Sequence, residues 1–274
     1  MTKKIKFNDD ILFCGQGAGV LAVECNTGIF EALEEYNLVP GKYLTSSGST
    51  LFSSLYCSVA DKGGTDWFKD LMERTTEKDF FVLKELAAVK TMCSCNNYMF
   101  DNSKVFDILN ETLTGESFRR VTTSVTRNSD YKSLMKKVTP AWALAATSIP
   151  LVFKPVKIGD EFYSDGGLLN NIPVPTVEET KNWKHIFVFL SPATKYKNEK
   201  NDFIIETLIN LLNAIMDREV AQLEEMGYFD LPNVTLIRPP SGLSGSLLKW
   251  SKNYELRKMC YEYTKEILEN VEIN

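Results

Sequence analysis

The alternation of short apolar runs with turns of very small residues constrains the fold of this 274-residue chain more than any other feature. An apolar run at 11–14 precedes a Gly-rich turn at 15–19 and then apolar residues at helical spacing, with Asn26 or Thr27 as the expected helix cap. A second run at 43–46 precedes a Ser-rich turn at 46–50 and another apolar helix. This order of strand, turn and helix, given twice, predicts βαβ-type α/β architecture.

The rest of the chain continues this pattern without a repeat or a Pro/Ser-rich linker, so we expect one domain over residues 1–274. Residues 61–120 have amphipathic helical spacing. Further strands are predicted at 120–127, 184–190 and 234–237, and further helices at 134–147, 204–225 and 247–271.

Composition and charge exclude several classes of protein. Apolar residues make up 44% of the chain and charged residues 24%, which excludes disordered, collagen-like and low-complexity chains. The net charge of -5 gives no reason to expect nucleic acid as a partner. The sequence has no apolar signal segment and no run of 18 apolar residues, and its six cysteines form no C-x-x-C pair. We therefore expect a cytoplasmic protein with buried free thiols.

The chain contains one histidine, His185, which limits the chemistry available to it. A site with several histidine ligands for a metal is impossible, and a Ser-His-Asp triad would have to use His185. Because His185 lies in an apolar strand pattern, we expect it to be a core or strand-end residue instead. No metal and no cofactor are expected.

Two turns of small residues have the form of functional loops. Residues 45–49 are small enough for a nucleophile elbow but lack the G-x-S-x-G pattern, and Ser-rich turns are usually surface turns or helix caps. Residues 15–19 read G-Q-G-A-G, which is neither a dinucleotide fingerprint nor a P-loop. The backbone N–H groups of that loop suit either a phosphate or an oxyanion hole.

The block that begins at Asp165 is more specific. Asp165, Gly166 and Gly167 are followed by L-L-N-N-I-P. An ordinary Asp-Gly turn between strands accounts for the first residues but not for Asn171 and Pro173.

Taken together, these motifs resemble those of the patatin-like phospholipases, over about residues 11–240. Residues 14–19 stand at the family's Gly-rich loop, 28–35 at its first helix, 45–49 at its G-x-S-x-G elbow, and 165–173 match its D-G-G/A motif closely. The resemblance implies a single-domain, three-layer α/β/α sandwich with a mostly parallel central sheet.

The resemblance also implies a catalytic Ser-Asp dyad without histidine, with Ser47 as the nucleophile and Asp165 as the general base. The implied oxyanion hole comprises Gly15, Gln16, Gly17, Ala18 and Gly19, and the implied turn-supporting residues are Ser46, Gly48, Gly166 and Gly167. The implied activity is that of a serine acyl hydrolase of phospholipase A type. Its substrate would be membrane glycerophospholipid, so peripheral contact with membranes is expected.

The elbow departs from the family pattern, because Thr45 and Ser49 replace its two glycines. A β-branched residue at position 45 is expected to strain the turn. A weak or inactive lipid-binding protein on the same fold therefore stays open as an alternative. The Gly-rich loop at 15–19 keeps a second alternative open, an unrelated nucleotide-binding α/β domain. Between the two adjacent serines, Ser47 is favoured, because Ser46 would place the bulky Leu44 two residues before the nucleophile.

Overall fold

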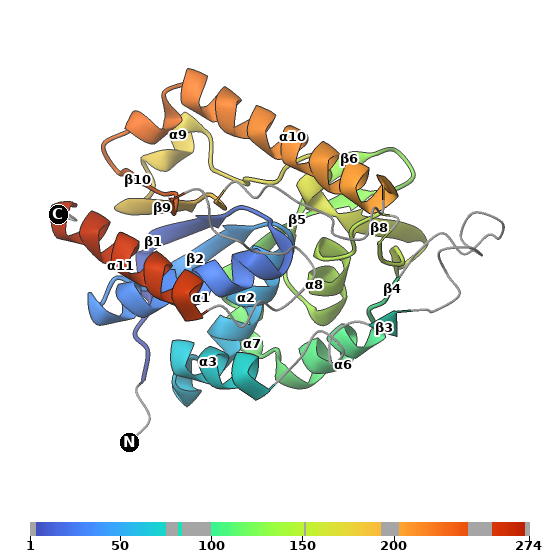
Figure 1. Ribbon diagram of the computed structural model, residues 1–274, viewed down its shortest axis with the longest axis horizontal. Coiled ribbons are helices and arrows are strands. Elements are labelled where there is room, and N and C mark those ends of the chain that lie inside the picture. Colours follow the sequence, from blue (N-terminus) through green and yellow to red (C-terminus); the bar gives the residue numbers. More distant parts are fainter. Residues whose placement is uncertain are drawn as a thin grey trace.

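The computed structural model describes residues 4–74, 82–83, 100–150, 152–192, 203–240 and 254–271. An eight-stranded sheet runs through it in the order β10-β9-β1-β2-β5-β8-β7, with β6 paired separately to β5 (Figure 1). The strands are β1 Asn8–Gly15, β2 Pro40–Thr45, β5 Val121–Arg127, β6 Lys132–Lys137, β7 Val156–Ile158, β8 Glu161–Asp165, β9 His185–Phe189 and β10 Val234–Ile237. A separate antiparallel pair joins β3 Val82–Leu83 to β4 Phe100–Asp101.

The central sheet is mostly parallel, as predicted. Strands β10, β9, β1, β2 and β5 pair in parallel, whereas β6 and β8 run antiparallel to β5. The helical segments are α1 Gly19–Glu35, α2 Ser47–Val59, η1 Ala60–Lys62, α3 Thr65–Arg74, α6 Ser103–Thr112, α7 Gly115–Arg120, α8 Pro140–Ala146, η2 Gly166–Leu168, α9 Val177–Thr180, α10 Phe203–Glu225, η3 Tyr228–Asp230 and α11 Tyr254–Asn270.

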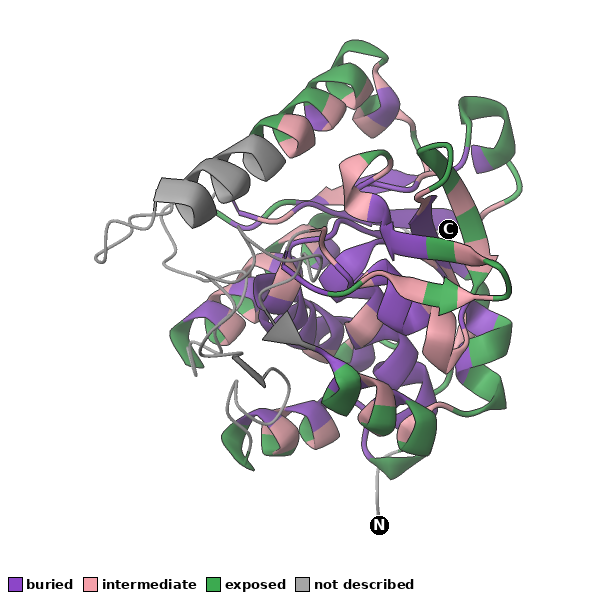
Figure 2. Cartoon of the chain, turned by 90° about the vertical axis from the view of Figure 1, so that its right-hand side faces the viewer, coloured by how far each residue is buried: buried purple, intermediate pink, exposed green. Residues whose placement is uncertain are grey.

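Helices cover both faces of the sheet, which gives the predicted three layers. Alternate residues of β1 point to opposite faces. Ile11 and Phe13 join the core beneath α1, α2 and α11, while Leu12 and Cys14 join a second core with Val220 of α10. Figure 1 shows these two helical layers on either side of the sheet, and Figure 2 shows that the buried residues concentrate in and around it.

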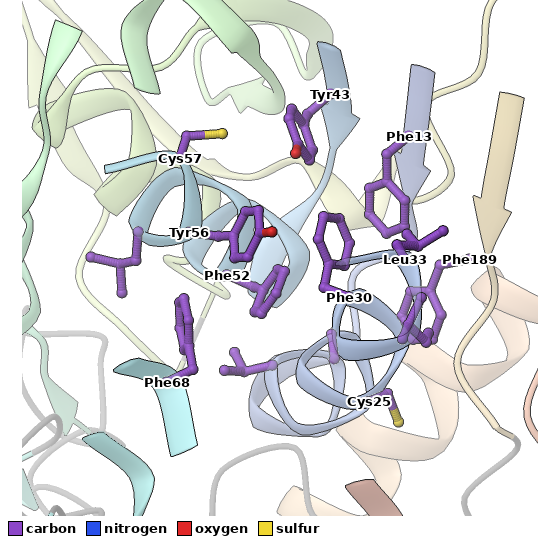
Figure 3. Close-up of a cluster of buried hydrophobic side chains, with 14 of the residues drawn as sticks. Phe13, Cys25, Phe30, Leu33, Tyr43, Phe52, Tyr56, Cys57, Phe68 and Phe189 are labelled. Carbon is purple, nitrogen blue, oxygen red and sulfur yellow. The ribbon is translucent and has the colours of Figure 1, made fainter. Parts of the chain in front are cut away.

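Aromatic packing fixes α1 and α2 against the sheet. The Phe30 ring of α1 lies 4.9 Å from the rings of Phe13 and Phe52 and 4.8 Å from that of Tyr56, measured between centroids (Figure 3). All four side chains are fully buried, and burial of a large apolar side chain stabilises a fold by roughly 1.5–3 kcal/mol. This cluster sets the positions of the two helices and hence of the turns that lead into them.

Those two turns lie side by side at the carboxyl ends of the parallel strands. Gly15 of β1 is in register with Thr45 of β2, and the N–H of Ser46 donates to the Gly15 carbonyl oxygen at 3.1 Å. In open α/β sheets, this edge is where ligands bind. The predicted Gly-rich loop and the predicted elbow therefore belong to one site.

Two sequence predictions of secondary structure are wrong at their boundaries. Helix α1 begins at Gly19 rather than after Asn26 or Thr27, because residues 20–30 are all buried and the hydroxyl of Thr27 donates within the helix to the carbonyl oxygen of Val23. The helix predicted at 134–147 is instead strand β6 followed by α8. Helix α11 confirms the predicted C-terminal helix from Tyr254, whereas residues 247–253 lie outside the described part.

No helix among the described residues has the length and apolar character that crossing a bilayer requires.

Candidate active site

The turn between β2 and α2 holds Ser47 in an unusual backbone conformation. Ser47 has a φ of 47°, in the left-handed region, whereas Ser46 is extended with a φ of -128°. A left-handed conformation costs a residue other than glycine roughly 1–2 kcal/mol, and such strain concentrates at functional sites. Ser47 lines a pocket, whereas Ser46 is fully buried and its hydroxyl has no hydrogen-bond partner among the described residues. The two adjacent serines therefore occupy different environments.

The expected strain at Thr45 is not found. Thr45 ends β2 in regular register with Gly15 and Thr123, and positive φ in this turn falls on Ser47 instead. The Thr45 hydroxyl shares a hydrogen bond of 3.0 Å with that of Thr50, which in turn shares one of 2.6 Å with that of Thr123. These three buried hydroxyls thus link the turn to the start of α2 and to β5.

Ser49, at the second replaced glycine, ties the turn to the Gly-rich loop. Its hydroxyl donates to the Gln16 carbonyl oxygen at 2.6 Å and accepts from the Asn26 side-chain amide at 3.0 Å. Between these positions, Gly48 approaches α1 so closely that a Cβ atom would collide with the Gly19 carbonyl oxygen. Glycine is therefore required at 48 but not at 49.

Asp165 ends β8 and is almost completely buried, with 3% of its surface exposed. Its Oδ1 accepts a hydrogen bond from the N–H of Gly167 at 2.8 Å, and its Oδ2 has no hydrogen-bond partner among the described residues. Burial raises the pKa of Asp165 from 3.8 to about 7, an effect that the nearby Ser47 hydroxyl and the Gly167 N–H partly offset. The side chain thus has one free oxygen and a pKa suited to accepting a proton near neutral pH.

Ser47 and Asp165 line the same open pocket. It is lined by Gly17, Ala18, Gly19, Ser47, Ile149, Asp165, Gly167, Leu168, Asn171 and Met216. The Ser47 hydroxyl lies near enough to lower the pKa of Asp165, although Oδ2 itself makes no hydrogen bond within the described structure. The fold therefore brings the two predicted dyad residues together from positions 118 apart in the sequence (165 − 47).

The Gly-rich loop offers two free backbone donors to this pocket. Gly15 lies within β1, the N–H of Gln16 donates to the Phe189 carbonyl oxygen at 3.2 Å, and the N–H of Gly17 donates to both oxygens of Asn171 at 3.2 Å. The N–H groups of Ala18 and Gly19 have no partner among the described residues, and both residues line the pocket. They begin α1, whose N-terminus favours negative charge. Of the five predicted oxyanion-hole residues, these two have donors available.

Two residues with no predicted role complete the surroundings of the pocket. Asn171 was unexplained in the sequence, and its side-chain N–H donates to the Gly17 carbonyl oxygen at 3.0 Å. The Glu219 carboxylate on α10 accepts from the N–H groups of Asn171 at 2.8 Å and Ile172 at 3.0 Å. Burial raises the pKa of Glu219, partly opposed by these two hydrogen bonds. The sequence carries no local signal for Glu219, because its partners lie 47 and 48 residues away.

His185 lies away from the pocket, as expected from its apolar context. It begins β9 in register with Ile11, whereas the pocket lies beyond Gly15 at the other end of β1. Its Nε2 shares a hydrogen bond of 2.8 Å with the Thr235 hydroxyl, and burial lowers its pKa to about 4. Within the described ranges, no cluster of three or more His, Cys, Asp or Glu residues could hold a metal ion, and the four described cysteines are buried and free.

Comparisons with known proteins identify the family of the chain. The family model described as patatin-like phospholipase matches residues 17–177, which is more than half of the chain. A crystal structure of VipD from Legionella pneumophila is similar over 95% of this chain and 66% of that one, with 13% sequence identity and a TM-score of 0.45. This chain thus spans about two thirds of the length of that structure. No curated protein sequence matches. On the strength of the family match, the chain belongs to the patatin-like phospholipases.

Proposed function

We propose that this protein is a serine acyl hydrolase of phospholipase A type that cleaves ester bonds of membrane glycerophospholipids. Family membership supports lipid acyl hydrolase activity in general. The observation that carries the finer proposal is that Ser47, at positive φ, lines the same pocket as Asp165, whose buried Oδ2 has no hydrogen-bond partner in the described part of the chain. A nucleophile held in a strained turn beside a base with a free acceptor oxygen is the arrangement that acyl transfer needs.

In the proposed first step, Asp165 Oδ2 accepts the proton of Ser47 Oγ as this oxygen attacks the ester carbonyl carbon. The N–H groups of Ala18 and Gly19 stabilise the negative oxygen of the tetrahedral intermediate. The carbon–oxygen bond to the alcohol then breaks, and Asp165 returns the proton to the leaving oxygen. An acyl-serine remains.

In the second step, Asp165 takes a proton from water while the water oxygen attacks the acyl carbon. The bond to Ser47 Oγ breaks, the serine regains a proton from Asp165, and the fatty acid leaves. Both steps use only side chains and backbone donors of this chain, so neither needs a metal or a cofactor.

The walls of the pocket support a lipid substrate. Ile149, Leu168 and Met216 present apolar side chains beside Ser47, which suits an acyl chain. Leu169 and Met135 are exposed by 50% and 39%, and the Asn170 side chain between them contacts the Met135 sulfur at 3.6 Å. We propose that this edge contacts the membrane peripherally, on the cytoplasmic side, and that nucleic acid is not a partner.

The two alternative functions gain no support from the geometry. The alternative of a weak or inactive protein rests on the missing elbow glycines, but hydroxyl hydrogen bonds hold the turn, and Ser47 lines the pocket. Phosphate binding needs several free N–H groups in the Gly-rich loop, and those of Gln16 and Gly17 are already bonded. The acyl hydrolase therefore remains the preferred proposal.

A fluorophosphonate probe followed by peptide mass spectrometry tests the nucleophile. We expect an adduct on Ser47, and we expect Ser47→Ala to lose both the adduct and the release of fatty acid from mixed phospholipid vesicles. Ser46→Ala is the matched control, since its buried hydroxyl has no partner to lose among the described residues. An adduct on Ser46, or labelling of Ser47→Ala at the wild-type rate, would reject the assignment.

A further inference from the structure

Helix α10 contributes Met216 to the pocket lining and Glu219 to the loop that follows Asp165. Glu219 points its two oxygens at two consecutive backbone N–H groups, those of Asn171 and Ile172, at 2.8 and 3.0 Å. No Lys or Arg pairs with Glu219 among the described residues. The charge of this partly buried carboxylate is therefore stabilised by the backbone of the loop that follows Asp165, and not by an ion pair.

Asn171 also forms hydrogen bonds with the Gly-rich loop. The Asn171 side chain donates to the Gly17 carbonyl oxygen at 3.0 Å, and its Oδ1 and backbone oxygen both accept from the Gly17 N–H at 3.2 Å. Gly17 directly precedes Ala18 and Gly19, which carry the two free donors. A continuous path of hydrogen bonds thus runs from Glu219 through Asn171 to the start of those donors.

We propose that Glu219 is a positioning residue that holds Asn171, and through it the oxyanion donors of Ala18 and Gly19, in place opposite Ser47. This inference rests on the proposed acyl hydrolase function. Glu219 is not among the residues that line the pocket, so it acts through Asn171 and does not touch the substrate. Two acceptor oxygens are needed, because an amide would turn its NH₂ group against one of the two N–H donors.

This role differs from a purely structural one in its kinetic signature. If Glu219 only stabilised the fold, the folded fraction of a variant would keep wild-type kcat and KM. If it positions the oxyanion donors, the folded variant loses transition-state stabilisation, so kcat falls while KM for the ester changes little. Small displacements of catalytic groups, of about 1 Å, cost up to about 100-fold in rate.

The test compares Glu219→Gln with Glu225→Gln, which makes the same substitution at an exposed position on the same helix. For each purified protein, kcat and KM for ester hydrolysis, the rate of fluorophosphonate labelling and the free energy of unfolding are measured. We expect Glu219→Gln to lower kcat and the labelling rate by about 10- to 100-fold at unchanged KM, and Glu225→Gln to match the wild type. Glu219→Asp keeps both acceptor oxygens on a shorter side chain and should recover part of the lost kcat.

Wild-type kcat in folded Glu219→Gln would overturn the proposal. So would a Glu219→Asp enzyme slower than Glu219→Gln, since side-chain length rather than the two acceptors would then matter. If Glu219→Gln does not fold, the test is the kcat of Glu219→Asp compared with that of the wild type. The shorter side chain displaces both acceptor oxygens, so we expect a lower kcat, and a kcat equal to that of the wild type would overturn the proposal. Failure of the proposed function looks different, because the wild-type protein itself would then show no labelling of Ser47.

Discussion

Replacing Asp165 with asparagine should abolish hydrolysis and, at the same time, stabilise the fold above neutral pH. The carboxyl group is buried, and its pKa is raised from 3.8 to about 7. Above that pKa, the folded protein carries a largely buried negative charge that no hydrogen bond to Oδ2 compensates in the described structure. The asparagine amide removes this charge and retains an oxygen for the Gly167 N–H.

The magnitude follows from the two pKa values. Between pH 3.8 and about 7, the folded state binds more protons at Asp165 than the unfolded state does, so stability falls as the pH rises. Because each tenfold change in proton affinity corresponds to about 1.4 kcal/mol, raising the pKa from 3.8 to about 7 costs the ionised folded protein about 4 kcal/mol. This penalty is absent well below the unfolded pKa and complete above the folded pKa. Wild type and Asp165→Asn should therefore be similarly stable at low pH and differ most in alkali.

Urea unfolding followed by tryptophan fluorescence measures the difference, because the chain contains four tryptophans. The advantage of Asp165→Asn in free energy of unfolding should be about 3 kcal/mol larger at about pH 8 than at about pH 5. In the wild type, kcat/KM should rise with pH around a midpoint near the Asp165 pKa of about 7, since the base must be ionised. A pH-independent stability difference would refute the buried charge, and hydrolysis by folded Asp165→Asn would refute the base.

Three further outcomes are expected. Fatty acid release should persist in excess EDTA, since no proposed step uses a metal, and a complete loss that calcium reverses would contradict the mechanism. His185→Gln should keep wild-type kcat and lose about 1 kcal/mol of unfolding free energy through its bond to Thr235, and a folded but inactive variant would reinstate a triad. Ser49→Gly, which restores a motif glycine, should destabilise the fold by about 1–3 kcal/mol in urea, because Gln16 and Asn26 lose their shared partner. A stabilised Ser49→Gly protein would show that these bonds contribute nothing.

Strands β9 and β10 could be predicted because nearly all of their residues are buried. Such strands are nearly continuous apolar runs, and β9 and β10 lie where the sequence predicts them. Strand β6 was missed for the opposite reason. It pairs with β5 along one edge, and its Lys-Ser-Leu-Met-Lys-Lys sequence carries only a weak apolar signal that also fits a helix.

The parts of the site that depend on distant contacts could not be predicted. Local motifs predict the proposed dyad residues, but the choice of the proposed oxyanion donors depends on which N–H groups are already bonded. Only the structure shows that Asn171 accepts the hydrogen bond of the Gly17 N–H, whereas the N–H groups of Ala18 and Gly19 have no partner in the described segments. The participation of α10 through Glu219 likewise follows from packing, since a helix sequence does not show which backbone its carboxylates reach.

The altered elbow separates two requirements that the G-x-S-x-G pattern combines. At position 48, the start of α2 meets the start of α1 with no room for a Cβ atom, so this glycine answers a steric limit. At positions 45 and 49, side chains fit, and each buried hydroxyl has the partners that burial demands, Thr50 for Thr45 and Gln16 and Asn26 for Ser49. The strained, left-handed backbone conformation lies at Ser47 and not at Thr45 or Ser49. What the elbow needs at its outer positions is therefore small volume with satisfied polar groups, and glycine is one of several ways to meet that need.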